Sequence, residues 1–319
     1  MGEVGGIGPR PRVLVLVGPT AAGKTPTAVE LALRLGGEVV SADARQVYRL
    51  LDIGTAKPTR EERARVPHHV IDILDPREDY NAGQYGQDAA RAIKEIVARG
   101  RVPIVTGGSG LYVRAVVDGL FEGPGRSVES RDRWEEAWRR RGEDGLRKAL
   151  QAVDPETERT TERGKPRRLI RALEEFEESG IPLSEHHRRQ RREVPFEFVQ
   201  VGITPPREEL YRRIERRACR MIEEGLVDEV RDLRNRGYDL SLNSLNTVGY
   251  REVFQHFDGE LDQNGMLHAI QTHTRQYAKR QLTWFRADDR IRWIEGAGGL
   301  SPERVAERVL SESWPVEGL

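Results

Sequence analysis

Five apolar residues at positions 13–17 are followed directly by Gly18-Pro-Thr-Ala-Ala-Gly-Lys-Thr25, and these two segments constrain the fold more than any others in the chain. A run of five β-favouring residues predicts a buried strand of a parallel sheet. The next eight residues fit the pattern G-x-x-x-x-G-K-[ST] of a phosphate-binding loop, and a helix is predicted from Thr25 onward. The alternative is a strand, a turn and a helix whose glycines occur by chance. The direct succession of strand, loop and helix, in the order that a phosphate-binding loop requires, argues against it.

The loop offers three kinds of contact to a phosphate group. Gly18 and Gly23 let the backbone curl so that its N–H groups point inward, and the N-terminus of the following helix adds positive potential. Lys24 supplies a positive charge, and Thr25 supplies a hydroxyl group for Mg²⁺. We therefore expect a diphosphate or triphosphate to bind the eight loop residues, which are Gly18, Pro19, Thr20, Ala21, Ala22, Gly23, Lys24 and Thr25.

Length and composition limit the class of protein. The 319 residues suffice for one large or two modest domains. The 52 basic and 52 acidic residues balance, so any nucleic-acid site must be a local one. The single cysteine, Cys219, excludes a disulfide framework and a cysteine-based zinc finger. Because the chain has no membrane-length apolar run and no secretory segment, we expect a soluble, cytoplasmic protein that does not bind membranes. We also expect a monomer.

The order of predicted elements indicates an α/β fold: a parallel P-loop sheet flanked by helices, with an inserted, mostly helical domain and a helical C-terminal part. The expected parts are a flexible lead-in, the first part of the core, the helical insertion and the return to the core, at residues 1–11, 12–121, 122–195 and 196–319. Further strands are expected at residues 38–41, 69–74, 102–106, 196–203 and 290–294. From residue 207 onward the pattern is otherwise helical to the end.

Asp43 directly follows the second predicted strand. Ligands of open α/β sheets bind beyond the carboxyl ends of the strands, so Asp43 is expected to meet the loop and the Gly-rich segment 106–110. Asp43 is either a base or substrate ligand that faces the phosphate, or an N-cap of the next segment, and the residues alone leave both open. Ser109 likewise either binds substrate or caps a helix. The strand at 102–106 ends without Asp or Glu, which argues against an ordinary ATPase.

Basic residues gather at three places. Arg213 and Arg217 lie one helical turn apart beside an apolar stripe, so they either extend over the core with their charges in water or bring a guanidinium to a phosphate. The cluster at 188–192 is either a solvated surface or a contact to an RNA backbone. On the helix near 266–286, basic and aromatic residues are interleaved, which suits stacking on unpaired bases as well as a protein core.

Several segments follow one another in an order typical of one family. They are the phosphate-binding loop, Ser41-Ala-Asp-Ala-Arg-Gln-Val-Tyr48, Asp52-Ile-Gly-Thr-Ala-Lys-Pro58, Gly107-Gly-Ser-Gly-Leu-Tyr112, Arg167-Arg-Leu-Ile-Arg-Ala-Leu173, Thr247-Val-Gly-Tyr-Arg-Glu252 and Gln276-Tyr-Ala-Lys-Arg-Gln-Leu-Thr-Trp-Phe-Arg286. In these segments the chain resembles the tRNA dimethylallyltransferases (tRNA isopentenyltransferases) of bacterial type. The resemblance implies transfer of a dimethylallyl group from dimethylallyl diphosphate to the exocyclic N6 amine of the adenosine 3′-adjacent to the anticodon, with release of diphosphate.

The resemblance also implies roles for individual residues. Asp43 matches the catalytic aspartate that takes a proton from the amine, while Lys24, Thr25 with Mg²⁺, and Arg217 stabilise the leaving diphosphate. Thr20 matches a loop position that lines the prenyl diphosphate site. The expected partner is a tRNA anticodon stem-loop, clamped by the helical insertion. The residues expected to contact the tRNA are Asp43, Ala44, Arg45, Gln46, Ser109, Arg167, Arg168, Leu169, Ile170, Arg171, Thr247, Gly249, Tyr250, Arg251, Lys279, Arg280, Gln281 and Arg286.

Three positions depart from the family pattern: Ala44 and Ala22 stand where Ser is frequent, and Ser109 stands where Thr is frequent. The alternatives to a tRNA-modifying prenyltransferase are an adenylate isopentenyltransferase acting on free AMP, a P-loop small-molecule kinase and a non-catalytic RNA-binding module. The charged insertion and the segment 279–286 argue against the first, and Asp43 beside a complete phosphate-binding loop argues against the last. A kinase predicts ATP turnover with a phosphorylated product.

Overall fold

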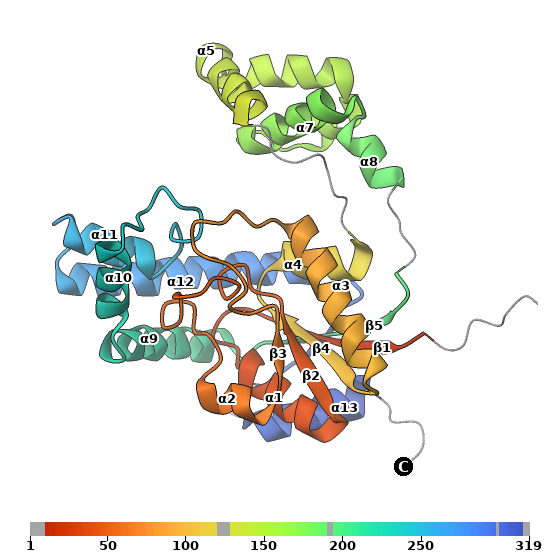
Figure 1. The fold of residues 1–319 in the computed structure, drawn as a ribbon, viewed down its shortest axis with the longest axis vertical. Coiled ribbons are helices and arrows are strands. Elements are labelled where there is room, and N and C mark those ends of the chain that lie inside the picture. The colour runs from red at the N-terminus through yellow and green to blue at the C-terminus, as the bar shows by residue number, and fades with distance from the viewer. Residues whose placement is uncertain (1–9, 120–127, 190–193, 298–299, 315–319) are drawn as a thin grey trace, which may run out of the picture. The chain divides into compact units, whose positions relative to one another are not determined.

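The computed structural model describes residues 10–119, 128–189, 194–297 and 300–314. The chain divides into two compact units, one of Met1–Val117 with Pro195–Leu319 and the other of Asp118–Val194 (Figure 1). Most of the expected lead-in, the expected boundary between residues 121 and 122, and part of the basic cluster at 188–192 lie outside the described residues. The expected domain boundaries at 11, 121 and 195 stay predictions.

The first unit is built on a six-stranded sheet in which every pair of neighbouring strands is parallel (Figure 1). The strand order is β3-β2-β4-β1-β5-β6. The strands are β1 Arg12–Val17, β2 Gly37–Ser41, β3 His68–His69, β4 Val102–Gly107, β5 Glu197–Ile203 and β6 Arg292–Ile294. The predicted α/β fold class is therefore confirmed, and β1, the strand before the phosphate-binding loop, lies between β4 and β5.

Both faces of this sheet are covered, which explains why β1 is an uninterrupted apolar run. On one face, α1 (Lys24–Leu35) packs beside α13 (Pro302–Ser313), and their apolar residues join those of β1 in one core cluster. Against β2 and β4, helix α3 (Ala82–Ala98) buries Tyr85, Ile93 and Ile96. The parallel arrangement brings the carboxyl ends of β1, β2 and β4 to one edge of the sheet, where the loop residues and Asp43 begin.

The remaining helices of the first unit lie between successive strands of the sheet in the sequence (Figure 1). They are α2 Arg60–Arg65, α4 Gly110–Arg114, α9 Arg207–Glu223, α10 Leu226–Asn235, α11 Tyr250–Phe257 and α12 Gln263–Arg286. The π-helical turn η1 Ala115–Gly119 follows α4 and contains the division between the two units. Among them, α9 packs on α12 and α10, and α11 packs on α10 and α12. None of the helices within the described ranges is both long and apolar enough to cross a membrane.

The second unit is helical within the described residues. Its helices are α5 Val128–Val153, α6 Pro155–Thr160, α7 Pro166–Ser179 and α8 Leu183–Arg189. Gly142 has a left-handed φ of 66° and breaks the helical conformation inside α5. The unit has a hydrophobic cluster of its own, which includes Leu146 and Leu150 of α5 and Leu169, Ile170 and Leu173 of α7.

Two predicted elements are wrong. The strand expected at 69–74 is only the two residues of β3, because Val70 and Asp72 both take a φ of 57° and turn the chain out of the sheet. The carboxylate of Asp72 is thereby directed to Lys57 and Arg63. The helical pattern expected from 207 onward is interrupted at residues 236–249, a segment that carries several Gly, Asn, Asp and Ser residues. It is held by contacts to the segment 75–76, where Tyr238 Oη donates to Asp75 and Ser244 Oγ to the Pro76 carbonyl.

Candidate active site

Two cavities open at the carboxyl edge of the sheet in the first unit. The loop cavity has a volume of about 1070 Å³ and is lined by residues of the phosphate-binding loop, the segment 52–63 and one side of α9. The helix cavity has a volume of about 570 Å³ and is lined by the other side of α9, the segment 246–251 and α12. The residues that line both cavities are Thr20, Asp43, Thr55, Arg217 and Met221. We call the place where these five lie the junction.

The phosphate-binding loop has the curled backbone that its glycines predict. Gly18 has a φ of 155°, and a Cβ there would lie 2.3 Å from the carbonyl oxygen of Ile203 in β5. Gly23 has a left-handed φ of 93° at the N-cap of α1. The ammonium group of Lys24 donates a hydrogen bond of 2.8 Å to the carbonyl of Pro19 across the loop. The loop therefore forms around its own lysine, with Lys24 and Thr25 both lining the loop cavity.

Two cations, Lys24 and Arg217, line this cavity, and burial disfavours the charged form of each. Burial lowers the pKa of Lys24 to about 8, opposed by the Asp43 carboxylate and reinforced by Arg217. Burial likewise lowers the pKa of Arg217 to about 10, with Arg220 adding to the shift and Asp43 opposing it. An anion bound between them would stabilise the charged forms of both side chains, because its negative charge would lie close to each.

The sequence left open whether Arg213 and Arg217 hold their charges in water. The guanidinium of Arg217 does not, because it is buried against the phosphate-binding loop. This guanidinium donates a short hydrogen bond to the hydroxyl group of Thr20 in the phosphate-binding loop. Arg213, one turn earlier, pairs instead with Glu209 at 2.9 Å and lines the loop cavity alone. The structure thus separates the two arginines: Arg217 belongs to the loop and the junction, and Arg213 to the wall of one cavity.

Asp43 caps the turn that follows it and also lines both cavities, and its role as base or substrate ligand stays a prediction. Its Oδ1 accepts hydrogen bonds from the backbone N–H groups of Arg45 at 2.8 Å and Gln46 at 3.4 Å, so the carboxylate caps the turn that follows it. The same carboxylate lines both cavities and acts on the charges of Lys24 and Arg217. A capped carboxylate is held in a fixed orientation, which suits a group that must accept a proton at a defined place.

The Gly-rich segment after β4 is tied to this turn and to the loop. Ser109 Oγ accepts from the backbone N–H of Ala44 at 2.9 Å, and it makes no capping bond to its own helix α4. Gln281 of α12 accepts from the N–H of Thr20 at 2.7 Å and donates to the carbonyl of Gly108 at 2.9 Å. Only 5 % of Gln281 is exposed, so its side chain links two loops of the protein, and its contact with tRNA stays a prediction.

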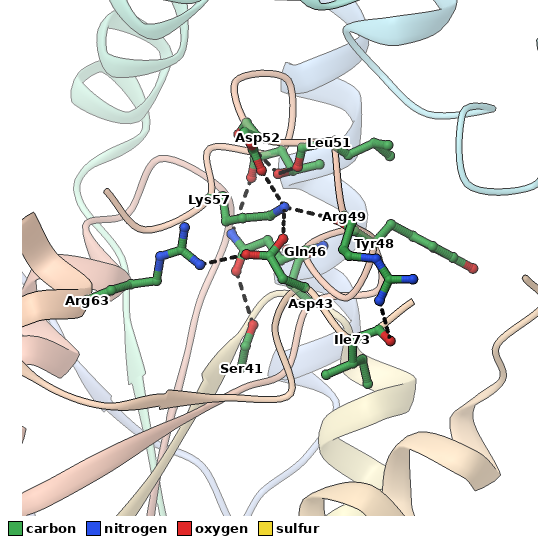
Figure 2. Close-up of polar contacts among 12 residues, drawn as sticks. Ser41, Asp43, Gln46, Tyr48, Arg49, Leu51, Asp52, Lys57, Arg63 and Ile73 are labelled. Carbon is green, nitrogen blue, oxygen red and sulfur yellow. Dashed lines mark hydrogen bonds and ion pairs between the residues drawn. The ribbon is translucent and has the colours of Figure 1, made fainter. Parts of the chain in front are cut away.

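The segment 52–58 is held by a network around the buried Lys57 (Figure 2). The ammonium group of Lys57 donates to the carboxylates of Asp52 and Asp72, at 2.5 and 2.6 Å, and to the carbonyl of Tyr48 at 2.9 Å. Beside it, Gln46 accepts from the hydroxyl group of Ser41 at 3.0 Å and donates to the carbonyls of residues 55 and 56. Gln46, expected to contact tRNA, is thus occupied in positioning the segment that carries Thr55.

A second anchor for the same segment comes from α10. Glu229 accepts from the backbone N–H groups of residues 52, 53 and 54 and from the hydroxyl group of Tyr250 at 2.6 Å. Tyr250 is fully buried and packs on Gly54, where a Cβ would lie 2.4 Å from its ring. The Tyr250 side chain is therefore occupied inside the protein, and the expected contact of this residue with tRNA stays a prediction. Glu229 and Lys57 were not predicted as positioning residues, although Lys57 lies in the segment 52–58 that resembles the family.

Other residues expected to contact tRNA line the helix cavity. Thr247, Gly249, Arg251 and Arg280 lie there, together with Ala44, Arg45 and Ser109. Arg45 donates to the carbonyl of Asn243, and Arg251 pairs with the buried Glu252 at 2.8 Å. Lys279 and Arg286 lie on the exposed side of α12, and the guanidinium of Arg286 stands 5.9 Å from the centre of the Trp293 ring.

The residues expected at 167–171 lie on α7 of the second unit and do not share one environment. Arg167 and Arg168 are exposed. The side chains of Leu169 and Ile170 are buried in the hydrophobic cluster of that unit, and the expected contact of these two residues with tRNA stays a prediction. Arg171 pairs with the buried Glu175 at 2.6 Å. Of the basic cluster at 188–192, Arg188 is exposed and pairs with Glu185 and Glu156.

Replacing Lys57 by methionine is expected to lower the free energy of unfolding by about 2 kcal/mol. Methionine keeps the buried stem, of which only 2 % is exposed, but it leaves Asp72 and the Tyr48 carbonyl without their ammonium partner. Urea denaturation followed by circular dichroism measures the change. Lys94→Met on the exposed side of α3 is the matched control and is expected to leave the midpoint unchanged. Equal midpoints for both variants would show that the network does not hold the segment.

Comparison with known families agrees with this geometry. A family model described as IPP transferase matches residues 46–288, and one described as isopentenyl transferase matches residues 11–72. The chain is 46 % identical over 288 residues to a tRNA dimethylallyltransferase of Geobacter metallireducens, covering 90 % of this chain and 93 % of that one. It is 44 % identical over 283 residues to a tRNA dimethylallyltransferase of Thermotoga petrophila, covering 88 % of this chain and 92 % of the relative.

Solved structures show the same likeness. The tRNA isopentenylpyrophosphate transferase of Bacillus halodurans matches with a TM-score of 0.70 at 38 % identity, covering 94 % of each chain. A eukaryotic dimethylallyltransferase acting on tRNA matches with a TM-score of 0.79 at 25 % identity, covering 97 % of this chain and 81 % of that one. Since both the family model and the relatives cover most of this chain, the chain belongs to the IPP transferase family and is a prenyltransferase rather than a kinase or a non-catalytic RNA-binding module.

Proposed function

We propose that this chain transfers the dimethylallyl group of dimethylallyl diphosphate to the N6 amine of the adenosine 3′-adjacent to the anticodon of tRNA. In this proposal the diphosphate binds in the loop cavity, the adenine enters the helix cavity, and the reaction takes place at the junction. The observation that carries the proposal is that the two cavities meet at a carboxylate, Asp43, and a guanidinium, Arg217. A prenyl transfer needs both groups at one place, one for the incoming amine and one for the departing diphosphate.

The leaving group is the diphosphate, so the loop cavity must stabilise growing negative charge. The bond between the allylic carbon and the diphosphate oxygen breaks, and its electron pair stays on the diphosphate. Lys24, Arg217 and the N–H groups of the loop are positioned before the reaction to receive that charge. The lowered pKa values of both cations support this role, because their charges are poorly compensated until an anion arrives.

The nucleophile is the exocyclic amine of adenine, whose lone pair is delocalised into the ring. A new bond forms between N6 and the allylic carbon, and N6 then gives up one of its protons. Asp43 accepts this proton and orients the amine, as a carboxylate within hydrogen-bonding reach can do. The base must leave its stack to reach the helix cavity, as bases do in enzymes that modify them.

The loop cavity also fits a bound Mg²⁺. No group of three or more His, Cys, Asp or Glu is arranged to hold a metal ion among the residues that the structure describes. Mg²⁺, however, commonly binds through one or two protein groups together with substrate phosphates and water, and Thr25 offers a hydroxyl group in this cavity. When bound there with the diphosphate, the ion would add positive charge that neutralises the leaving group.

The tRNA contacts in this proposal are local, because the chain as a whole is neutral. Arg45, Arg251 and Arg280 at the helix cavity would receive the loop nucleotides, and Lys279 and Arg286 would contact phosphates along α12. The helical unit of residues 118–194, with Arg167 and Arg168 exposed on α7, would clamp the anticodon stem-loop. We further propose that the protein works as a monomer in the cytoplasm.

The assay for this proposal incubates the protein, Mg²⁺ and unmodified tRNA with labelled dimethylallyl diphosphate. Label is expected in the tRNA, at the adenosine next to the anticodon, as shown by nuclease digestion and mass spectrometry. Parallel reactions contain AMP or ATP in place of tRNA. Label in AMP but not in tRNA would establish an adenylate isopentenyltransferase and overturn the proposal, as would a phosphorylated product formed from ATP.

Donor binding is expected to weaken about fivefold between pH 8 and pH 9. The pKa of Lys24 is about 8 in the protein without ligand. Above this pH, Lys24 is neutral in most molecules and must take up a proton before its ammonium group can bind the diphosphate. Below about pH 7 the lysine is already charged and the affinity stays level. Calorimetric titration with a non-reactive thio analogue of the donor measures the profile. Lys24→Arg keeps its charge over the whole range and should give a flat profile; a flat profile in the unaltered protein contradicts the prediction.

A further inference from the structure

Helix α9 forms the wall between the two cavities, and its side chains are sorted by the cavity that they line. The arginines at 213, 216 and 220 line the loop cavity alone, and Ile214 and Ala218 line the helix cavity alone. Arg217 and Met221 line both cavities. These two residues are four positions apart and therefore lie on the same face of the helix, one turn from each other. At the junction, α9 therefore presents the guanidinium of Arg217 and, one turn later, the thioether of Met221.

The chemistry of the five junction residues is divided between polar and apolar contacts. The hydroxyl group of Thr20 accepts from Arg217, and Asp43 is a carboxylate. The hydroxyl group of Thr55 donates to the carbonyl of Leu51 at 2.7 Å, so it is satisfied within its own segment. Met221 is the residue of the five whose side chain has no strong hydrogen-bonding group, and 7 % of it is exposed. The apolar surface of the junction is therefore chiefly that of Met221.

We propose that Met221 contacts the dimethylallyl group at the junction and limits the length of the prenyl chain that the site accepts. This inference rests on the proposed function. The reacting carbon must lie between the diphosphate at Arg217 and the amine at Asp43, and the rest of the five-carbon group follows it into the same space. An unbranched thioether packs closely on such a group, and its polarisable sulfur suits the positive charge that develops as the diphosphate leaves.

The position of Met221 also accounts for a limit on chain length. The side chain stands on the wall shared by both cavities, so a longer prenyl chain would have to pass it or displace it. Shortening this side chain would open space at the junction and remove a contact to the five-carbon group. One change would therefore shift the preference of the enzyme between donors of different length while leaving the diphosphate contacts in place.

The test compares dimethylallyl and geranyl diphosphate as donors, with saturating tRNA. Met221→Ala is expected to lower kcat/KM for the five-carbon donor about tenfold and to raise the ratio of geranyl to dimethylallyl transfer by at least tenfold. Inhibition by inorganic diphosphate should stay within about twofold of the unaltered enzyme, because Lys24 and Arg217 are untouched. Met221→Leu, similar in volume, should keep kcat/KM within about threefold.

Control variants separate this role from a structural one. Ile214→Ala, on the same helix but lining the helix cavity alone, should leave the ratio between the two donors unchanged. Should Met221→Ala fail to fold, Met221→Val shortens the side chain less and carries the same test. Equal losses for both donors, or weaker inhibition by inorganic diphosphate, would overturn the inference. Absence of transfer in the unaltered enzyme would instead overturn the proposed function, so the two failures are distinguishable.

Discussion

Replacement of Asp43 by alanine is expected to lower kcat/KM for tRNA prenylation by about 10³-fold, while the protein stays folded. Asp43 lies at the junction of the two cavities, where its negative charge favours the charged forms of Lys24 and Arg217. Without the carboxylate, the amine has no group to orient it or to accept its proton. Single-turnover measurement with labelled donor and excess enzyme reports the chemical step directly.

A second substitution separates the two jobs of this carboxylate. Alanine also removes the acceptor for the N–H groups of Arg45 and Gln46, which costs about 1 kcal/mol of stability. Asp43→Asn keeps an oxygen that can accept these bonds but cannot take a proton at neutral pH. We expect Asp43→Asn to be as inactive as the alanine variant and as stable as the unaltered protein. Full activity of Asp43→Asn would remove the residue from the role of base and leave it the role of a turn cap.

Replacement of Arg217 by methionine is expected to lower kcat/KM about 10²- to 10³-fold without lowering the melting temperature. Burial lowers the pKa of this guanidinium to about 10, which shows that its charge is held at a cost in the protein without ligand. A neutral side chain of similar length removes that cost and also removes the charge that the departing diphosphate needs. Activity and stability should therefore move in different directions, as at other sites adapted to function.

Binding measurements locate the defect of this variant. The affinity for inorganic diphosphate should fall, while the affinity for tRNA, followed by filter binding, should change little. Arg213→Met, one turn earlier and paired with Glu209, is the matched control and should lose less than about tenfold in kcat/KM. If Arg217→Met instead melts at a clearly lower temperature and binds diphosphate normally, then the guanidinium has a structural role.

Much of this site could be predicted from the sequence because its parts are local. The phosphate-binding loop is set by its own glycines, and Asp43 is placed by the strand that ends just before it. Parallel strands then bring both to one edge of the sheet. The local pattern could not decide whether Asp43 caps a turn or faces a cavity, because one side chain can do both, as its cap bonds and its place in the cavity wall show.

The positioning residues could not be predicted because their partners are distant in the chain. Gln281 reaches the loop from α12, and Glu229 reaches the segment 52–54 from α10. The sequence around Glu229 reads as a charged surface helix, and nothing in it indicates that this carboxylate accepts three backbone hydrogen bonds from a distant segment. For the same reason the sequence did not show that the side chains of Tyr250, Leu169 and Ile170 are buried, because core residues are interspersed in the segments that resemble the family.

The errors in secondary structure have a related cause. The apolar run at 69–74 looks like a strand, but the ion pairs of Asp72 with Lys57 and Arg63 fix a different path for the chain. Tertiary contacts here override local propensity. The segment 236–249 is a loop for a local reason, since its Gly, Asn, Asp and Ser residues favour turns, and this signal was available in the sequence.

The place of β1 between β4 and β5 has a consequence for how the protein is made. While a ribosome synthesises the chain, β4 is complete at residue 107, but β5 is complete only at residue 203, after the whole helical unit. At on the order of 10 residues per second this leaves one edge of β1 open for roughly ten seconds. An open edge can pair with another nascent chain. The phosphate-binding loop also gains a neighbour late, because Ile203, whose carbonyl lies close against Gly18, is the last residue of β5.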